Sequence, residues 1–382
     1  YIAAAVLLEK LLSRLEVHRS LRFSLIFLLP LAALVCGNYW FRTELLAQPW
    51  RFHIAMEMAL MLCVAAILPH FSLPRIPVRV LQAAFILFCC VQAVHYRSYA
   101  RRLIRRIDVS KTSEYKMSRW IAQNLPGERV MVPGSVSFWL NVFADTPQLT
   151  GCCSQGLIDR EVRYGQYQIE NDIGAKGREF PITLVWLQAL GVRAIGVSGP
   201  RSTEWYKAIQ HPGKFVGKLP ELWRDGDDVV YRVPQRSASL VHVLRRDQAV
   251  SRAPVNGIDI DPLLPYVAAL EDPAYPQAEI TWKSDNLAQI QAPLDSGELL
   301  SIQIAADPGW RAVSNGKPLR IEKDGLGFMM VDPQCTGLCT VDLIYNGGLE
   351  ASITGFVSSL ALVFGLVVLV FKVRISLIKS AE

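Results

Sequence analysis

Near its C-terminal end the chain runs ITGFVSSLALVFGLVVLVF, the 19 residues Ile353–Phe371, without one charged side chain. A helix needs about 20 consecutive apolar residues to cross the hydrocarbon core of a bilayer. Three further stretches come close to this length and composition: Arg22–Phe41, Phe52–Pro69 and Ile76–Val94. The sequence therefore predicts an integral membrane protein with four full membrane-spanning helices.

The charged residues divide unevenly along the chain. The 382 residues include 40 Lys and Arg against 34 Asp and Glu, a net charge of +6. Residues 1–106 hold 13 of the basic and 4 of the acidic residues, and residues 372–382 hold 3 and 1. The region between them has 24 basic and 29 acidic residues. The basic excess thus belongs to the apolar ends, as in loops that flank membrane spans, and no nucleic-acid partner is expected.

The first residues, YIAAAVLLE, are as apolar as the end of a membrane helix. The positive cluster follows this run, whereas in a signal peptide it precedes the apolar segment. We therefore expect the C-terminal part of a longer protein, with a truncated span at residue 1 and about four full spans after it.

Loop charges predict the orientation, because short cytoplasmic loops are rich in Lys and Arg. If the truncated span ends in the cytoplasm, that side holds Lys10, Arg14, Arg19, Arg22, Arg75, Arg79, Lys372, Arg374 and Lys379. The opposite side holds Arg42 and Arg51 in its one short loop. This orientation places the large region between Val94 and Ile353 outside the cytoplasm.

A run of arginines on the expected outer side conflicts with this orientation. It comprises Arg97, Arg101, Arg102, Arg105 and Arg106. Either the helix continues past the membrane and these residues anchor it at the lipid headgroups, or they bind a phosphate-bearing ligand.

Glu57 is an acidic residue within a predicted span. Carboxylates at membrane depth often have a function in transport or catalysis. Glu57 lies near the start of its span, so it could equally reach the interface or pair with a neighbouring helix.

Residues 107–351 are long enough for two domains of ordinary size. The first, 107–236, mixes helix and strand patterns. We expect a helix that is capped by Ser113 and ends before Pro126, a short buried strand in ERVMVPG, and a helix, glycine turn and strand in ITLVWLQALGVRAIGVSG. No glycine-rich nucleotide loop occurs in it. The region is predicted to be an extracytoplasmic α/β domain that follows a transmembrane helical region over 1–106.

Short alternating strands begin near Ser237 and continue to residue 351. Turn residues separate them, and Asn315-Gly316 is the strongest hairpin signal, because both central positions of a type I′ turn require positive φ. The pattern predicts an antiparallel β-sandwich over 237–351. The sandwich would be tethered directly to a final span and a short cytoplasmic tail over 352–382.

The chain has eight cysteines. Four lie in or beside predicted spans, where a thiol is an ordinary packing residue: Cys36, Cys63, Cys89 and Cys90. Cys335 and Cys339 flank a predicted turn, so a local disulfide is geometrically reasonable in an extracytoplasmic region. Cys152 and Cys153 are adjacent and either pair elsewhere or stay free. No zinc site is expected, because residues 107–351 contain only two histidines.

Four carboxylates are interleaved with basic and aromatic residues in LIDREVRYGQYQIENDIGAKGREF: Asp159, Glu161, Glu170 and Asp172. Such a mixture either lines a polar cleft that could bind a sugar or forms a solvated, salt-bridged surface helix. Large aromatic residues allow the same two interpretations, as core residues or as platforms for sugars: Trp139, Trp186, Trp282 and Trp310. No Ser, His and Asp grouping for nucleophilic catalysis can be assembled from two histidines.

Two segments, WIAQNLPGERVMVPGSVSFWLNVFADTPQLTGCCSQG and DPGWRAVSNGKPLRIEKDGLGFMMVDPQCTGLCTVDLIYNGG, stand between several spans and a single final span. This arrangement resembles the C-terminal half of large bacterial multi-spanning membrane proteins that look like GT-C-type, polyprenyl-phosphate-sugar-dependent glycosyltransferases. Some members carry the label pyruvoyl-tetrahydropterin synthase-related membrane protein. The resemblance is most specific over Asp307–Gly348, which is similar to the family's membrane-proximal β-domain.

The resemblance implies the C-terminal portion of a multi-pass glycosyltransferase in the bacterial inner membrane. Its partners would be membrane lipids, a polyprenyl-phosphate sugar and an extracytoplasmic glycan or protein acceptor. The family's catalytic acid lies in a loop upstream of residue 1, so no catalytic residue carries over, no cofactor is evident here, and a divalent metal would belong to that upstream part. Pterin chemistry is not expected, because the synthase holds zinc through three histidines and residues 107–351 contain only two. The alternative is a non-catalytic membrane-anchored scaffold or glycan-binding protein.

Overall fold

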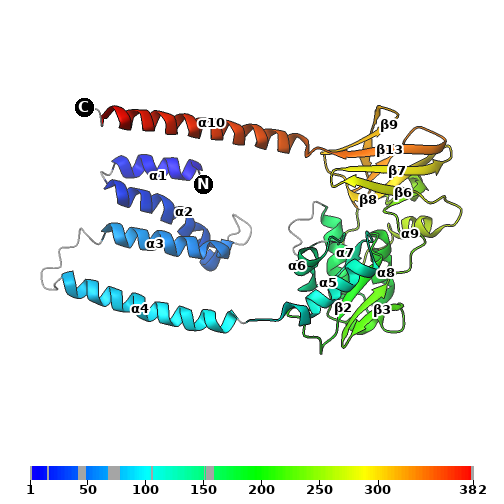
Figure 1. Ribbon diagram of the computed structural model, residues 1–382, viewed down its shortest axis with the longest axis horizontal. Helices are drawn as coiled ribbons and strands as arrows, with labels where there is room; N and C mark the ends of the chain where they lie inside the picture. Colours follow the sequence, from blue (N-terminus) through cyan, green and yellow to red (C-terminus); the bar gives the residue numbers. More distant parts are fainter. Residues whose placement is uncertain are drawn as a thin grey trace. The chain divides into compact units, whose positions relative to one another are not determined.

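The computed structural model describes residues 2–14, 17–41, 49–67, 78–104, 106–149, 151 and 159–379. The chain divides into two compact units, Tyr1–Arg106 and Ile107–Glu382. The elements of the first unit are α1 (Ile2–Arg14), α2 (Arg19–Phe41), the 3-10 helix η1 (Pro49–Phe52), α3 (His53–Ile67) and α4 (Val78–Leu103) (Figure 1). Within this unit α2 packs against both α1 and α3.

The contact between α2 and α3 is made by few and mostly small side chains. Ala59 and Cys63, one helical turn apart, are the buried residues of α3, and Ser24 and Leu31 are those of α2. Small residues on one face let two helices approach closely, as in membrane helix pairs. Most other apolar side chains of α3 are exposed.

Two helices among the described residues are long and apolar enough to cross a membrane, Arg19–Phe41 with 23 residues and Gly348–Val367 with 20. The prediction of about four full spans is therefore wrong. α3 has only 15 residues, which at about 1.5 Å per residue falls short of a hydrocarbon core of roughly 30 Å. α4 is long enough, with 26 residues, but ends in the polar sequence HYRSYARRL.

The second unit begins with a small mixed sheet covered by helices (Figure 1). Its strand order is β1 (Val130–Met131), β2 (Ala194–Ser198), β4 (Asp228–Arg232) and β3 (Glu221–Asp225). Only the β1 and β2 pair is parallel within this sheet, and the connection between them contains α6 (Val136–Phe143), α7 (Arg160–Asn171) and α8 (Glu179–Ala189). The 3-10 helix η3 (Val109–Lys111) and α5 (Ser113–Asn124) precede this sheet, and η5 (Pro212–Phe215) follows β2.

Local sequence signals in this part are confirmed, with one shift. α8 ends at Ala189, Gly191 turns the chain with φ 67°, and β2 follows, as the helix, glycine and strand pattern predicts. α5 starts at Ser113, but its cap is Thr112, whose hydroxyl oxygen accepts a hydrogen bond from the Tyr115 amide at 3.2 Å. The cap therefore lies one residue earlier than expected.

Two antiparallel sheets follow. The larger has the order β10 (Lys317–Leu319), β9 (Trp310–Ser314), β13 (Gly337–Tyr345), β7 (Leu287–Leu294) and β6 (Glu279–Ser284). The smaller has the order β11 (Ile321–Lys323), β12 (Phe328–Val331), β8 (Glu298–Ala305) and β5 (Val241–Arg245). The 3-10 helix η6 (Arg246–Gln248) and α9 (Leu264–Glu271) lie between β5 and β6 in sequence. Asn315 and Gly316, with φ 50° and 76°, form the predicted two-residue hairpin between β9 and β10.

The smaller sheet is buried on both faces. On β12, Met329 and Val331 belong to the apolar core shared with the larger sheet, whereas Phe328 and Met330 belong to the core that contains α7 and α8. Alternate residues of a strand point to opposite faces, so one strand serves two cores. The α/β part and the strands after residue 236 are thus joined by a continuous core, and residues of the first part can meet loops of the second.

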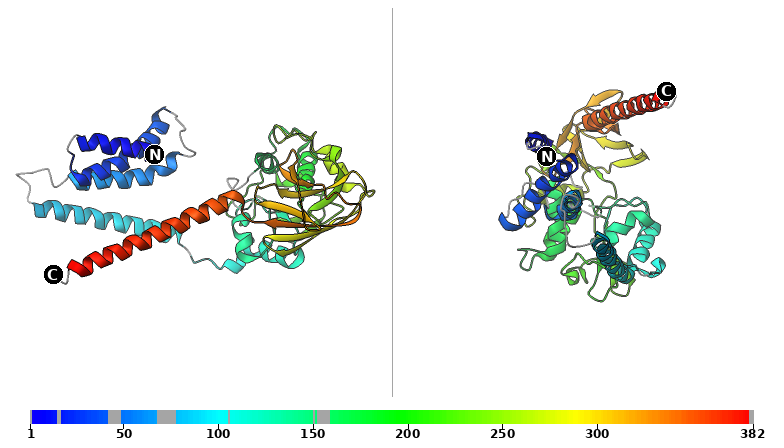
Figure 2. Two further views of the ribbon diagram at one scale, coloured as in Figure 1. Left: turned by 90° about the horizontal axis from the view of Figure 1, so that it is seen from above. Right: turned by 90° about the vertical axis from the view of Figure 1, so that its left-hand side faces the viewer.

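The last helix, α10, runs from Gly348 to Lys379 and follows β13 almost directly. Figure 2 shows it leaving the strands as one uninterrupted helix. Its first 20 residues are the second candidate membrane span.

Candidate functional site

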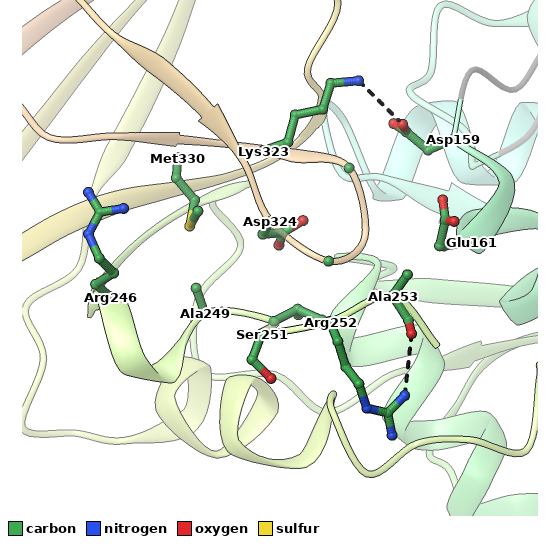
Figure 3. Close-up of a pocket in the computed structure, with 13 residues that line it drawn as sticks. Asp159, Glu161, Arg246, Ala249, Ser251, Arg252, Ala253, Lys323, Asp324 and Met330 are labelled. Atoms are coloured by element: carbon green, nitrogen blue, oxygen red, sulfur yellow. Dashed lines mark hydrogen bonds and ion pairs between the residues drawn. The ribbon is translucent and has the colours of Figure 1, made fainter. Parts of the chain in front are cut away.

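A pocket of about 530 Å³ lies where three segments of the second unit meet. The start of α7 supplies Asp159 and Glu161, and residues 246–253 after β5 supply another wall. The turn between β11 and β12 closes it with Lys323 and Asp324 (Figure 3). The pocket therefore depends on the packing of the α/β part against the smaller sheet.

The turn Asp324–Gly327 is built by its own hydrogen bonds. Asp324 Oδ1 accepts bonds from the amides of Leu326 at 2.9 Å and Phe328 at 2.8 Å. Gly327 has φ 81°, a left-handed conformation that favours glycine. A Cβ atom there would overlap the Asp159 carboxyl group. Glycine at this position thus allows the turn to approach the start of α7 closely.

Asp159 is largely buried, with 9% of its surface exposed. It stands at the cap position of α7, yet its side chain makes no capping hydrogen bond. Oδ1 lies 3.7 Å from the Lys323 ammonium group, and Oδ2 is buried without a protein partner among the described residues. Burial raises the pKa of Asp159, and the nearby charge of Lys323 opposes this increase.

Asp324 is partly buried, and it also has a raised pKa. Its Oδ2 is buried without a hydrogen-bond partner in the described part of the chain. The pKa of Asp324 is raised to about 6, mainly by burial and also by the negative charge of Asp159, while hydrogen bonds from the amides of Phe328 and Leu326 oppose the increase. A buried carboxyl group, Asp159, and a partly buried one, Asp324, therefore lie on this pocket, each with one buried oxygen that has no partner among the described residues.

The two arginines of the pocket are already paired. Arg252 donates two hydrogen bonds to Asp259, at 2.6 and 3.0 Å, and Arg246 donates one to Glu322 at 2.5 Å. Among the described residues, the ion pair of Lys323 is the long contact with Asp159. Carboxylate oxygens are thus in excess over available cations in the pocket. The arrangement can accept hydrogen bonds from a ligand's hydroxyl or ammonium groups.

A metal site requires several ligands that converge on one point. No group of three or more His, Cys, Asp and Glu side chains among the described residues is arranged to hold a metal ion. The pocket's carboxylates are better suited to hydrogen bonding than to coordination.

The four predicted carboxylates do not form one cleft. Asp159 and Glu161 lie at the start of α7, whereas Glu170 and Asp172 lie at its other end, about 15–20 Å away along a helix axis of 1.5 Å per residue. Gln166 donates a hydrogen bond to Glu170 at 3.0 Å. Burial raises the pKa of Glu170. The far end of α7 is a separate polar cluster.

The structure places the predicted arginines on and beyond the end of α4. Arg97 and Arg101 are exposed and one helical turn apart, and Arg106 is exposed after the helix. Arg102 belongs to the last turn of α4, and Arg105 lies outside the described residues. Positive charges near a helix C-terminus are stabilised by the helix dipole, so this placement also has a purely structural explanation.

The remaining candidates are dispersed. Glu57 is exposed on α3. Cys335 and Cys339 form a disulfide, whereas Cys152 and Cys153 lie outside the described residues. The other four cysteines are free: Cys36, Cys63, Cys89 and Cys90. Among the tryptophans, Trp186 is fully buried and belongs to the core, whereas Trp139 and Trp282 are nearly half exposed.

Sequence reasoning missed Asp324 and Lys323, the two residues that complete the pocket. The available signal was the sequence Asp324-Gly325-Leu326-Gly327 between two apolar runs. An aspartate followed by two closely spaced glycines is typical of a turn with a side-chain to backbone hydrogen bond. The pattern predicts the turn but not its neighbour at residue 159.

Replacing Asp324 with asparagine is expected to stabilise the protein above about pH 6 by up to about 3 kcal/mol. The pKa of Asp324 is raised to about 6 from an ordinary 3.8. The contribution of this group to stability is therefore greatest below the ordinary value and is lost as the pH rises through about 6. Denaturant unfolding of both proteins near about pH 4 and about pH 7 measures the difference.

The exposed Asp285, in the turn between β6 and β7, offers a matched control as Asp285→Asn. This control should leave the pH dependence of the wild type unchanged. An Asp324→Asn variant with the wild-type pH dependence would contradict the raised pKa.

The comparisons with known proteins add no family. No family model matches the chain, and no curated protein or solved structure matches it. The residues of the pocket must therefore support any functional assignment by their own geometry.

Proposed function

We propose that this chain is a membrane-anchored protein whose second unit binds a polyhydroxylated or amino-bearing ligand, such as the sugar unit of a glycan, in the pocket of Asp159 and Asp324. One observation carries the proposal: Asp159 and Asp324 each keep a buried carboxylate oxygen that has no protein partner within the described part of the chain. An unsatisfied buried acceptor costs free energy, which a ligand that donates hydrogen bonds would recover. The excess of carboxylates favours neutral or cationic sugars over acidic ones.

Membrane anchoring rests on the two helices that could cross a bilayer. We propose a multi-pass arrangement in a bacterial inner membrane, with the second unit outside the cytoplasm. The Cys335–Cys339 disulfide supports an oxidising compartment for this unit, because disulfides persist in the periplasm and are rare in the cytoplasm.

A second candidate function is the C-terminal portion of a polyprenyl-phosphate-sugar-dependent glycosyltransferase. In that role the pocket would hold a glycan acceptor while an upstream segment performs catalysis. The observation that favours it is the exposed pair Arg97 and Arg101, one turn apart at the end of α4. Two guanidinium groups at this spacing could contact one lipid-linked phosphate.

The binding proposal is tested by titrating the full chain, held in phosphatidylcholine and phosphatidylglycerol nanodiscs, with glucosamine and N-acetylglucosamine by calorimetry. We expect glucosamine to bind more tightly, because it carries an ammonium group. Asp159→Asn and Asp324→Asn should each weaken binding about tenfold or more, the effect of one hydrogen bond to a charged group.

Asp285→Asn is the matched control and should bind like the wild type. If neither sugar binds the wild-type chain, or if both pocket variants bind as well as the control, the glycan proposal is wrong. For the second candidate function, the double variant Arg97→Gln with Arg101→Gln in the complete protein should reduce glycolipid turnover. Unchanged turnover would exclude this candidate function.

A further inference from the structure

The junction between the larger sheet and α10 is short and held by hydrogen bonds. β13 ends at Tyr345 and α10 begins at Gly348. The Asn346 amide donates to the Gly309 carbonyl at 3.0 Å, and Asn346 Oδ1 accepts a bond from the Gly348 amide at 3.0 Å. Residues 345–348 thus leave no free linker, so the end of the sheet must stay at the level where α10 starts.

Three aromatic residues gather at this same end of the larger sheet. Trp310 and Tyr345 have ring centroids 5.0 Å apart, and Trp282 lies 6.3 Å from Trp310. We call these three residues the aromatic cluster. They come from β6, β9 and β13, so the cluster spans the sheet rather than one strand.

The cluster occupies positions on the inner side of the sheet. Tyr345 stands two residues after Leu343, and Trp310 stands two residues before Ala312, both of which are buried. Trp282 is the register partner of the buried Ala288. Residues two apart, and direct partners on neighbouring strands, share one face.

Inner positions of a sandwich are ordinarily covered, whereas these are covered only in part. Trp282 remains 45% exposed, and Trp310 and Tyr345 are only partly buried. The first turns of α10 also carry exposed apolar side chains, Leu349, 74% exposed, and Ile353, 53% exposed. Exposed apolar side chains therefore stand both at this end of the sheet and at the start of the candidate span.

We propose that the aromatic cluster lies in the headgroup layer of the bilayer that α10 enters, and that lipid covers it. Tryptophan and tyrosine concentrate at this layer, because their rings are apolar while their N–H and O–H groups remain hydrated. The fixed junction holds the cluster within a few residues of the span. The cluster then helps to fix how the sheet stands on the membrane. This inference rests on α10 spanning a bilayer and does not depend on sugar binding.

Fluorine NMR of the full chain labelled with 5-fluorotryptophan tests the proposal residue by residue. The chain would be held in phosphatidylcholine and phosphatidylglycerol nanodiscs, with or without a lipid that carries a gadolinium chelate on its headgroup. Single Trp→Phe variants assign the signals. Gadolinium should broaden the signals of Trp282 and Trp310 about twofold or more over those of a control pair. The reason is that paramagnetic relaxation falls steeply with distance from the gadolinium ion, which lies in the headgroup layer where tryptophan concentrates.

Trp120 and Trp223 form the matched control pair, since their rings are also in contact, with centroids 6.1 Å apart, and they are partly buried, but they lie on α5 and β3. Equal broadening of the two pairs would overturn the proposal. So would a shift of the Trp282 and Trp310 signals by glucosamine without any effect of gadolinium lipid, which would make the cluster a sugar platform. The decisive spectra are those of the wild type, so a variant that fails to fold leaves the result intact.

Discussion

Replacing Trp186 with alanine is expected to lower the free energy of unfolding of the second unit by about 3–5 kcal/mol. Trp186 lies on α8, is fully buried, and its indole N–H donates a hydrogen bond to the Gly257 carbonyl at 2.7 Å. Removing the ring leaves a large cavity and an unpaired carbonyl group. Denaturant unfolding of the full chain in detergent, followed by near-ultraviolet circular dichroism, measures the loss.

Trp205 supplies the matched control, because 87% of its surface is exposed. Trp205→Ala should change stability by less than about 0.5 kcal/mol. A Trp186→Ala variant as stable as this control would mean that the core described around α7 and α8 is not formed.

The contact between Trp186 and α7, which contributes to this loss of stability, can be tested separately at Gly165. A Cβ atom at Gly165 would overlap the Trp186 ring, so α7 and α8 approach each other through a glycine. Gly165→Ala should therefore destabilise the wild type but be tolerated in the Trp186→Ala background. The coupling energy of this double-mutant cycle is expected to be about 1–3 kcal/mol, and additive effects would contradict the contact.

Features that depend on a few neighbouring residues follow correctly from the sequence. The Asn315-Gly316 hairpin formed because positive φ at two adjacent positions is accessible to these two residue types. The turn at Gly191 between α8 and β2 has the same origin. In both cases the backbone conformation is determined locally, so no knowledge of distant contacts was needed.

The number of membrane spans was harder to predict, because an apolar stretch does not show where a helix begins and ends. The stretch Phe52–Pro69 contains a helix of only 15 residues, His53–Ile67, and its first residue, Phe52, belongs to η1. The stretch Ile76–Val94 contributes to α4, which extends into the arginine-rich segment. Composition therefore overestimated the spans, while the uncharged run at the C-terminus remained a candidate.

The pocket could be predicted only in part, because its residues are distant in sequence. Asp159 was recognised, but the helix that follows it carries Glu170 and Asp172 to the other end. Asp324 reaches Asp159 only because β12 packs its Phe328 and Met330 against the α/β part. No periodicity or motif reports such a contact between two regions.

A second large effect on stability is expected from a substitution at the far end of α7. Lys214→Met is expected to destabilise the second unit by about 3–5 kcal/mol, the usual cost of removing one partner of a buried ion pair. The side chains of Lys214 and Asp172 are 4% and 2% exposed, and the ammonium group lies 2.7 Å from Asp172 Oδ1. Burial lowers the pKa of Lys214, and Asp172 opposes this shift. Denaturant unfolding near neutral pH measures the effect.

The double variant Lys214→Met with Asp172→Asn distinguishes a lost charge pair from lost packing. Asp172 has φ 55° at the end of α7, a left-handed conformation that asparagine also tolerates. Without the buried negative charge, at least about half of the lost stability should return. If the double variant is as unstable as Lys214→Met alone, the packing of the lysine stem is the cause. Because Asp172 lies at the opposite end of α7 from Asp159, glucosamine binding by the folded double variant should remain at the wild-type level.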